Sequence, residues 1–166
     1  MLSIMLMLLF YVGGDRYALD TKRVVEVIPR VTLKKVYHAP EYIAGLFNYR
    51  GCLVPVIDFC HLINGSPSHP YLSTRIILIS CQGSNLSQPQ SNNEVSTRIL
   101  GLMAERVTDT LNKSEREFIN PGIKVDDSPY LGEMITDEQG MIQFLKVEKL
   151  LPENQDKNIL IPSVEY

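Results

Sequence analysis

The apolar stretch at residues 46–57, broken once by a charged turn, constrains the fold more than any other part of the sequence. It predicts a β-hairpin with Arg50 and Gly51 at the turn, because Gly51 can take the positive φ that a tight turn needs. The returning arm is apolar on both faces, which favours burial. Pro55 cannot donate to a ladder and places that arm at a sheet edge or a bulge.

Arg50 is the unusual residue of this hairpin, since it is a permanent cation between two apolar arms. It could be an ordinary solvated turn residue, or it could be an interaction hot spot held on a rigid platform. Spacing alone favours the solvated interpretation.

Short apolar runs bounded by turn residues recur along the whole chain and predict an all-β fold. The two halves also repeat an order of glycine, strand, turn, strand and short helix, which suggests two similar β-lobes. We expect one domain over residues 1–151 made of two interleaved lobes, at about 8–73 and 74–151, and a flexible tail at 152–166. The polar residues 82–97 are expected to form a long flexible loop.

The expected strands are residues 4–12, 17–19, 24–29, 31–36, 46–49, 52–57, 75–81, 99–103, 130–135 and 141–145, with one-turn helices at 22–25, 38–45, 59–63 and 147–151.

Composition narrows the possible partners and the compartment. The 166 residues carry a net charge of −3, and no basic patch is evident, which argues against nucleic acid or an anionic membrane as the main partner. Cys52, Cys60 and Cys81 make no even disulfide framework and fit free thiols in a reducing cytoplasm. The apolar N-terminus is too short to span a bilayer and lacks the basic region of a signal peptide, so it is interpreted as a buried strand.

No catalytic or cofactor motif is present. The sequence lacks a P-loop, a dinucleotide fingerprint, a nucleophile elbow and a zinc-binding helix motif. Cys52, Cys60 and His61, even with His38 or His69, match no standard zinc spacing. We therefore expect no enzyme activity, no metal and no cofactor.

Several segments together resemble the CheW-like domain family over roughly residues 8–151. The opening is carried by residues 10–19 and 24–28, and the most distinctive run by residues 39–45, 48–51 and 54–59. Residues 101–107, 130–132 and 145–151 carry the remainder. The resemblance implies two five-stranded SH3-like antiparallel β-barrels with a few short helices and a shared hydrophobic interface.

The resemblance also implies an adaptor that couples chemoreceptors to a chemotaxis histidine kinase. By position, the helical hairpin tip of the receptor would dock at Val24, Glu26, Gly45, Asn48 and Arg50. The regulatory domain of the kinase would dock at barrel ends, for which no short motif fixes the residues. Apolar candidates there are Leu111, Phe118, Ile119, Tyr37 and Tyr42. Such a protein is expected in the cytoplasm, recruited to receptor arrays without inserting into the membrane, and monomeric in dilute solution.

Departures from the family pattern keep alternatives open. Tyr49 stands where leucine is common, and residues 82–97 are longer than the usual connection. Related adaptors serve pilus motility and phototaxis, which the sequence does not separate from flagellar chemotaxis. A self-associating assembly protein and, less favoured, a thiol-dependent enzyme remain as other hypotheses.

Overall fold

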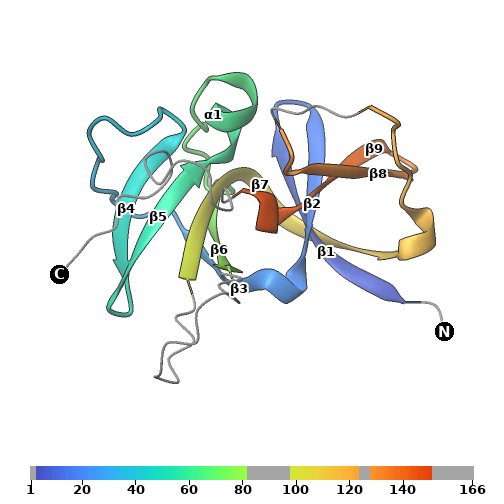
Figure 1. Cartoon of the computed structure of the whole chain (residues 1–166), viewed down its shortest axis with the longest axis horizontal. Coiled ribbons are helices and arrows are strands. Elements are labelled where there is room, and N and C mark those ends of the chain that lie inside the picture. The colour runs from blue at the N-terminus through green and yellow to red at the C-terminus, as the bar shows by residue number, and fades with distance from the viewer. Residues whose placement is uncertain (1–2, 82–97, 124–127, 151–166) are drawn as a thin grey trace, which may run out of the picture.

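The computed structural model describes residues 3–81, 98–123 and 128–150. These residues form a mainly β structure, as the sequence predicts, with a single α-helix among them (Figure 1). The elements in chain order are β1 (Ile4–Val12), β2 (Asp15–Asp20), β3 (Val24–Pro29), β4 (Ile43–Tyr49), β5 (Cys52–Asp58), α1 (Phe59–Asn64), β6 (Arg75–Cys81), β7 (Arg98–Ser114), β8 (Leu131–Asp137) and β9 (Gly140–Leu145), with 3₁₀ turns at Thr21–Arg23, Glu115–Glu117 and Val147–Lys149. No helix among the described residues has the length and apolar character needed to cross a bilayer.

The strands form two five-stranded barrels, which we name lobe A and lobe B. Lobe A contains β1, β2, β9, β8 and the second half of β7, and an isolated bridge between Ile119 and Met134 closes it. Lobe B contains β3, β6, β5, β4 and the first half of β7, and a bridge between Lys34 and Leu46 closes it. Most pairs are antiparallel, but β2 with β9 and β5 with β7 are parallel.

The lobes do not follow the expected division at residues 73 and 74. The first two strands pair with the last strands of the chain, whereas β3 to β6 build lobe B with the start of β7. A sequence repeat suggests lobes in succession, but strand pairing here joins the two ends of the chain.

One 17-residue strand, β7, belongs to both lobes. It pairs with β6 as far as Ala104 and with β1 from Glu105 onward (Figure 1). Arg106 has a φ of 51° at the changeover, and the register of β1 shifts between Leu9 and Tyr11 beside it. The sequence predicts no strand at residues 106–114, because these residues are mostly polar and their own sequence does not show that they pair with the apolar β1.

The largest hydrophobic cluster lies between the lobes. Leu8 and Phe10 of β1 meet Ile77 and Ile79 of β6 in this shared core. The intervening residues face the barrel interiors, so Met7 lies in the core of lobe A and Leu78 lies in that of lobe B. Alternate residues of each strand thus enter different cores, which explains why both runs are apolar throughout.

Two local predictions were wrong. Residues 31–36 contribute only the bridge at Lys34, because β3 ends at Pro29. Residues 38–45 form no helical turn: His38 has a φ of 65°, and from Ile43 the chain is extended against β5. The central hairpin, by contrast, is confirmed, and Asp58 caps α1 by accepting from the His61 backbone N–H.

Candidate functional site

The turn between β4 and β5 brings three of the chemically distinctive side chains together. Tyr49, the last residue of β4, donates its hydroxyl hydrogen to Glu26 Oε2 on β3. Arg50 Nη2 lies 3.6 Å from the same carboxylate oxygen. The Arg50 guanidinium also lies over the Tyr49 ring, 5.1 Å from its centroid. The result is a compact Glu26–Tyr49–Arg50 cluster that joins two strands at one end of lobe B.

The backbone of the turn holds this cluster in place. Arg50 and Gly51 both have positive φ, 49° and 85°, as a tight hairpin turn requires. Asn48 Oδ1 accepts a hydrogen bond of 2.9 Å from the Gly51 backbone N–H and closes the turn. The Arg50 side chain is 78% exposed, so its charge is available at the surface.

The hydrogen bond to Glu26 shifts the acid–base behaviour of Tyr49. Because the ionised phenol could no longer donate to the carboxylate, the pKa of Tyr49 is raised, first through this bond and then through desolvation. The nearby Arg50 charge acts in the opposite direction. Tyr49 therefore stays a protonated donor throughout the physiological range.

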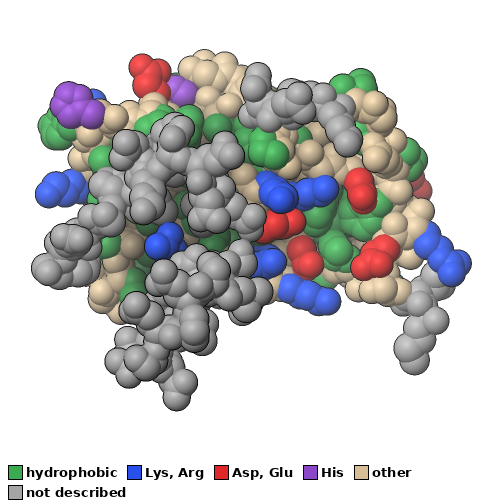
Figure 2. Space-filling model, in the orientation of Figure 1, with side chains coloured by type: hydrophobic (Ala, Val, Ile, Leu, Met, Phe, Trp, Pro, Cys, Tyr) green, Lys and Arg blue, Asp and Glu red, His purple; other side chains and the backbone are tan. Residues whose placement is uncertain are grey.

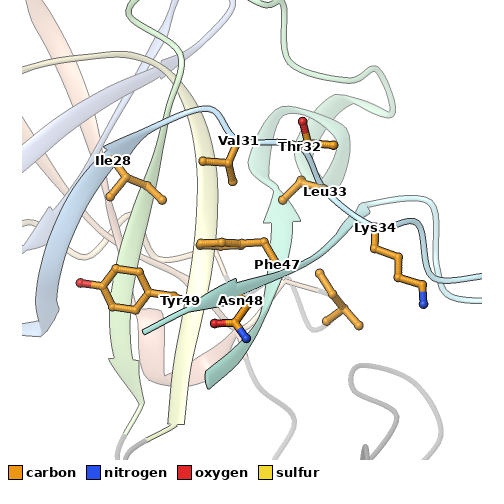
Figure 3. A pocket seen from close by; sticks show the side chains of 9 residues that line it. Ile28, Val31, Thr32, Leu33, Lys34, Phe47, Asn48 and Tyr49 are labelled. Atoms are coloured by element: carbon orange, nitrogen blue, oxygen red, sulfur yellow. The ribbon is translucent and has the colours of Figure 1, made fainter. Parts of the chain in front are cut away.

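An open groove of about 610 Å³ adjoins the cluster. In Figure 3, Phe47 of β4 lies below Val31, and Ile28 lies to one side of them. Tyr49 and Asn48 lie further along β4, and the Lys34 side chain points away from the groove. The groove is lined by Ile28 of β3, by residues 31–34 after that strand and by residues 46–49 of β4. The strands β3 and β4 are not hydrogen-bonded neighbours in the sheet. Its floor is largely apolar.

The structure does not bring all the predicted receptor-site residues into this cluster. Val24 is half-buried and packs against the core between the lobes. Gly45 is buried at a register shift on β4, where an added Cβ would lie 2.6 Å from the Lys34 carbonyl oxygen. Gly45 thus has a packing role that sequence position alone did not reveal. Asn48, Glu26 and Arg50 do lie together, and Tyr49 joins them.

The apolar candidates for the second surface differ in exposure. Leu111 and Phe118 pack against the core of lobe A, and Tyr42 packs against the core between the lobes. Ile119 is 55% exposed and Tyr37 is 76% exposed, which leaves these two available to a partner. On the face visible in Figure 2, basic and acidic side chains are intermingled.

The thiol of Cys60 is buried and has a raised pKa, whereas a catalytic cysteine needs a lowered one. Desolvation raises its pKa to about 11, so it is protonated at neutral pH. A thiolate, rather than a thiol, is the attacking species in cysteine catalysis. Among residues 3–81, 98–123 and 128–150, no group of three His, Cys, Asp or Glu residues is arranged to hold a metal ion.

Known proteins resemble this chain along most of its length. Residues 6–155 match the CheW-like domain family. The chemotaxis protein CheW of Rhizobium meliloti (strain 1021) is 24% identical over 148 residues, which cover 88% of this chain and 86% of the relative. The chemotaxis protein CheW of Bacillus subtilis (strain 168) is 22% identical over 154 residues, covering 92% and 90%. The crystal structure of the scaffolding protein TtCheW from Thermoanaerobacter tengcongensis superimposes with a TM-score of 0.77 at 22% identity, covering 96% of this chain and 95% of that one.

Proposed function

Because the chain belongs to the CheW-like domain family, we propose that it is a non-catalytic adaptor that couples chemoreceptors to a histidine kinase in a chemotaxis-type system. The family match over residues 6–155 is the observation that carries this proposal. The names of the relatives, which are chemotaxis and scaffolding proteins, support it.

We place the receptor contact at the Glu26–Tyr49–Arg50 cluster, with Asn48 beside it and Val24 at its margin. The partner is the helical hairpin tip of a receptor. Arginine is enriched among residues that dominate binding energy at interfaces, and a rigid turn reduces the entropy lost on association. Gly45 supports this surface through the backbone packing described above.

The kinase contact is assigned to other surfaces, at the barrel ends that expose Tyr37 and Ile119. The regulatory domain of the kinase is the proposed partner. Each contact alone is expected to be weak, and effective concentration in an assembled array strengthens both. The adaptor acts in the cytoplasm and reaches the membrane through the receptors that it binds.

Replacing the exposed cation tests the receptor contact. Arg50→Ala is expected to weaken binding of a receptor tip fragment about thirtyfold, since truncating a central interface arginine often costs ~2 kcal/mol. Binding to the kinase regulatory domain and the melting temperature should barely change, because an exposed ion pair contributes only about 0–1 kcal/mol. Isothermal titration of both partners measures the two affinities.

Arg116→Ala is the matched control, since Arg116 is an exposed arginine of lobe A. It should leave receptor affinity unchanged. Equal losses toward both partners in Arg50→Ala, together with a lowered melting temperature, would mean that Arg50 is structural and not a receptor contact.

Sedimentation of the pure protein separates the adaptor from a self-associating assembly protein. We expect a monomer at low micromolar concentration that forms a heterocomplex when the kinase regulatory domain is added. A homodimer that persists after the addition of kinase would favour the assembly function.

A further inference from the structure

We propose that Tyr49 is a positioning residue that fixes Glu26 and Arg50 as one unit, so that lobe B presents both charges to its protein partner in a set geometry. This inference rests on the proposed receptor contact and deepens it. It concerns a residue to which the family resemblance assigns no role in binding.

The topology of lobe B explains why such a residue is needed. Its strand order is β3, β6, β7, β5 and β4, so Glu26 on β3 and Arg50 after β4 lie at the first and last strands of this order. Among the described residues, the bridge between Lys34 and Leu46 is the only backbone pairing that joins these ends. It lies three residues before Tyr49 on β4, so backbone hydrogen bonds do not set the distance between the two charges.

Tyr49 supplies the missing link with its ring and with its hydroxyl. The ring packs against the core of lobe B and meets Phe47 edge-on, with centroids 6.4 Å apart. From this anchored position the hydroxyl donates to Glu26 Oε2, and the ring face lies under the Arg50 guanidinium. One half-buried side chain therefore contacts both charged groups while its ring packs against the core of lobe B.

The ion pair could not hold this geometry alone. Arg50 is 78% exposed, and its 3.6 Å contact with Glu26 is the kind of surface pair that contributes little. A hydrogen bond to a charged acceptor is stronger than a neutral one, and a packed aromatic ring has few rotamers to lose. Tyr49 thus preorganises the pair and lowers the entropy that binding must overcome.

The same contacts indicate what kind of partner fits. Both the Tyr49 hydroxyl and Arg50 approach Glu26 through Oε2, and Oε1 has no hydrogen-bond partner among the described residues. A complementary surface would offer a donor to Oε1 and an acceptor, such as a carboxylate or a carbonyl oxygen, to the guanidinium.

A double-mutant cycle tests whether Tyr49 acts through Glu26. Tyr49→Phe keeps the ring and removes the hydroxyl, and it should weaken binding of a receptor tip fragment about fivefold. Glu26→Ala should weaken binding at least as much. The double variant should bind like Glu26→Ala alone, because the hydroxyl then has nothing to position.

Tyr71→Phe is the matched control, since Tyr71 is 49% exposed and its hydroxyl makes no hydrogen bond within the described residues. It should bind like the wild type. Wild-type affinity in Tyr49→Phe, or losses from Tyr49→Phe and Glu26→Ala that multiply, would overturn the inference.

A second measurement does not depend on the receptor. In the protein labelled with ¹³C-tyrosine, the ring signal of Tyr49, assigned by its loss in Tyr49→Phe, should titrate above the ordinary tyrosine range. Glu26→Ala should bring that titration down, because the hydrogen bond to Glu26 is the first cause of the raised Tyr49 pKa. An unchanged Tyr49 titration in Glu26→Ala would overturn the link even if both variants bind poorly. If the wild type fails to bind the tip fragment while this titration behaves as expected, the adaptor function fails and the positioning contact stands.

Discussion

At the scale of single residues, one buried ion pair stands out from the exposed charges. Arg16 on β2 and Asp137 at the end of β8 form a bidentate pair, in which Arg16 Nη1 donates to Asp137 Oδ2 at 2.8 Å and Nη2 donates to Oδ1. Their side chains are only 7% and 19% exposed. The hydrogen bonds from Arg16 lower the pKa of Asp137 to about 2.

This pair makes the stability of lobe A depend on pH. A carboxyl whose pKa is lower in the folded state stabilises the fold above its unfolded pKa of about 4 and loses that contribution as pH falls towards 2. We expect Asp137→Asn to lower the free energy of unfolding by about 2 kcal/mol at pH 7, with the difference shrinking below pH 4. Urea denaturation at pH 7 and pH 2.5 measures both values. A loss of the same size at both pH values would show that the charge of Asp137 is not what stabilises the fold.

The residues of the candidate site show how far sequence reasoning reaches. The family resemblance points to Glu26 and Arg50 by position, and the structure places Arg50 Nη2 3.6 Å from Glu26 Oε2. The sequence shows Tyr49 only as a departure from the family pattern. Its hydrogen bond to Glu26 is not predictable, because the two residues are 23 positions apart and no local pattern links them. The resemblance also points to Gly45 for this site, but the role of Gly45 follows from the close approach of the Lys34 backbone, which the sequence does not show.

At the scale of elements, the sequence predicts a strand well where the residues of that strand are themselves apolar and buried. The central hairpin and β6 follow directly from their β-branched and apolar residues. The second half of β7 does not, because Thr108, Asp109 and Thr110 resemble loop residues until β1 pairs with them. Pairing with an apolar neighbouring strand overrides the weak intrinsic β-propensity of these residues. The sequence of one strand does not show which strand will be its neighbour, so this pairing cannot be predicted locally.

The closure of lobe B can be tested at Gly45. This residue has a φ of 151°, and an added Cβ would also lie 2.8 Å from Leu33 Cβ. Gly45→Ala should therefore destabilise the protein by about 2 kcal/mol or more, through backbone strain and displacement of residues 33–34.

Gly13→Ala is the control for Gly45→Ala, because Gly13 also has positive φ, 58°, but nothing lies within 4 Å of its added Cβ. It should cost about 1 kcal/mol, from strain alone. Thermal unfolding of both variants gives the comparison. Equal losses of stability in the two variants would mean that residues 33–34 move aside at little cost and do not close the barrel of lobe B tightly.

At the scale of the whole molecule, the sequence predicted two barrel lobes but not which strands belong to each. The repeated order of turns suggests two consecutive units, yet β1 and β2 complete the lobe that contains β8 and β9. Such pairings join residues more than a hundred positions apart, such as Arg16 with Ile142, and local patterns do not encode them. The large core between the lobes depends on this exchange, since β1 and β6 each contribute alternate residues to it.

The interleaved chain path has a consequence for cutting the protein in two. A break within residues 82–97 would separate β1 to β6 from β7 to β9, and neither piece would contain all strands of either lobe. Each piece would be unable to bury its apolar strands alone, whereas together they would restore both barrels at once. We expect fragments 1–81 and 98–166 to be largely unfolded separately and to regain the native circular dichroism spectrum when refolded together. The molecule would then serve as a split reporter, in which reassembly signals that two fused proteins have met; a native-like spectrum from either fragment alone would contradict this use.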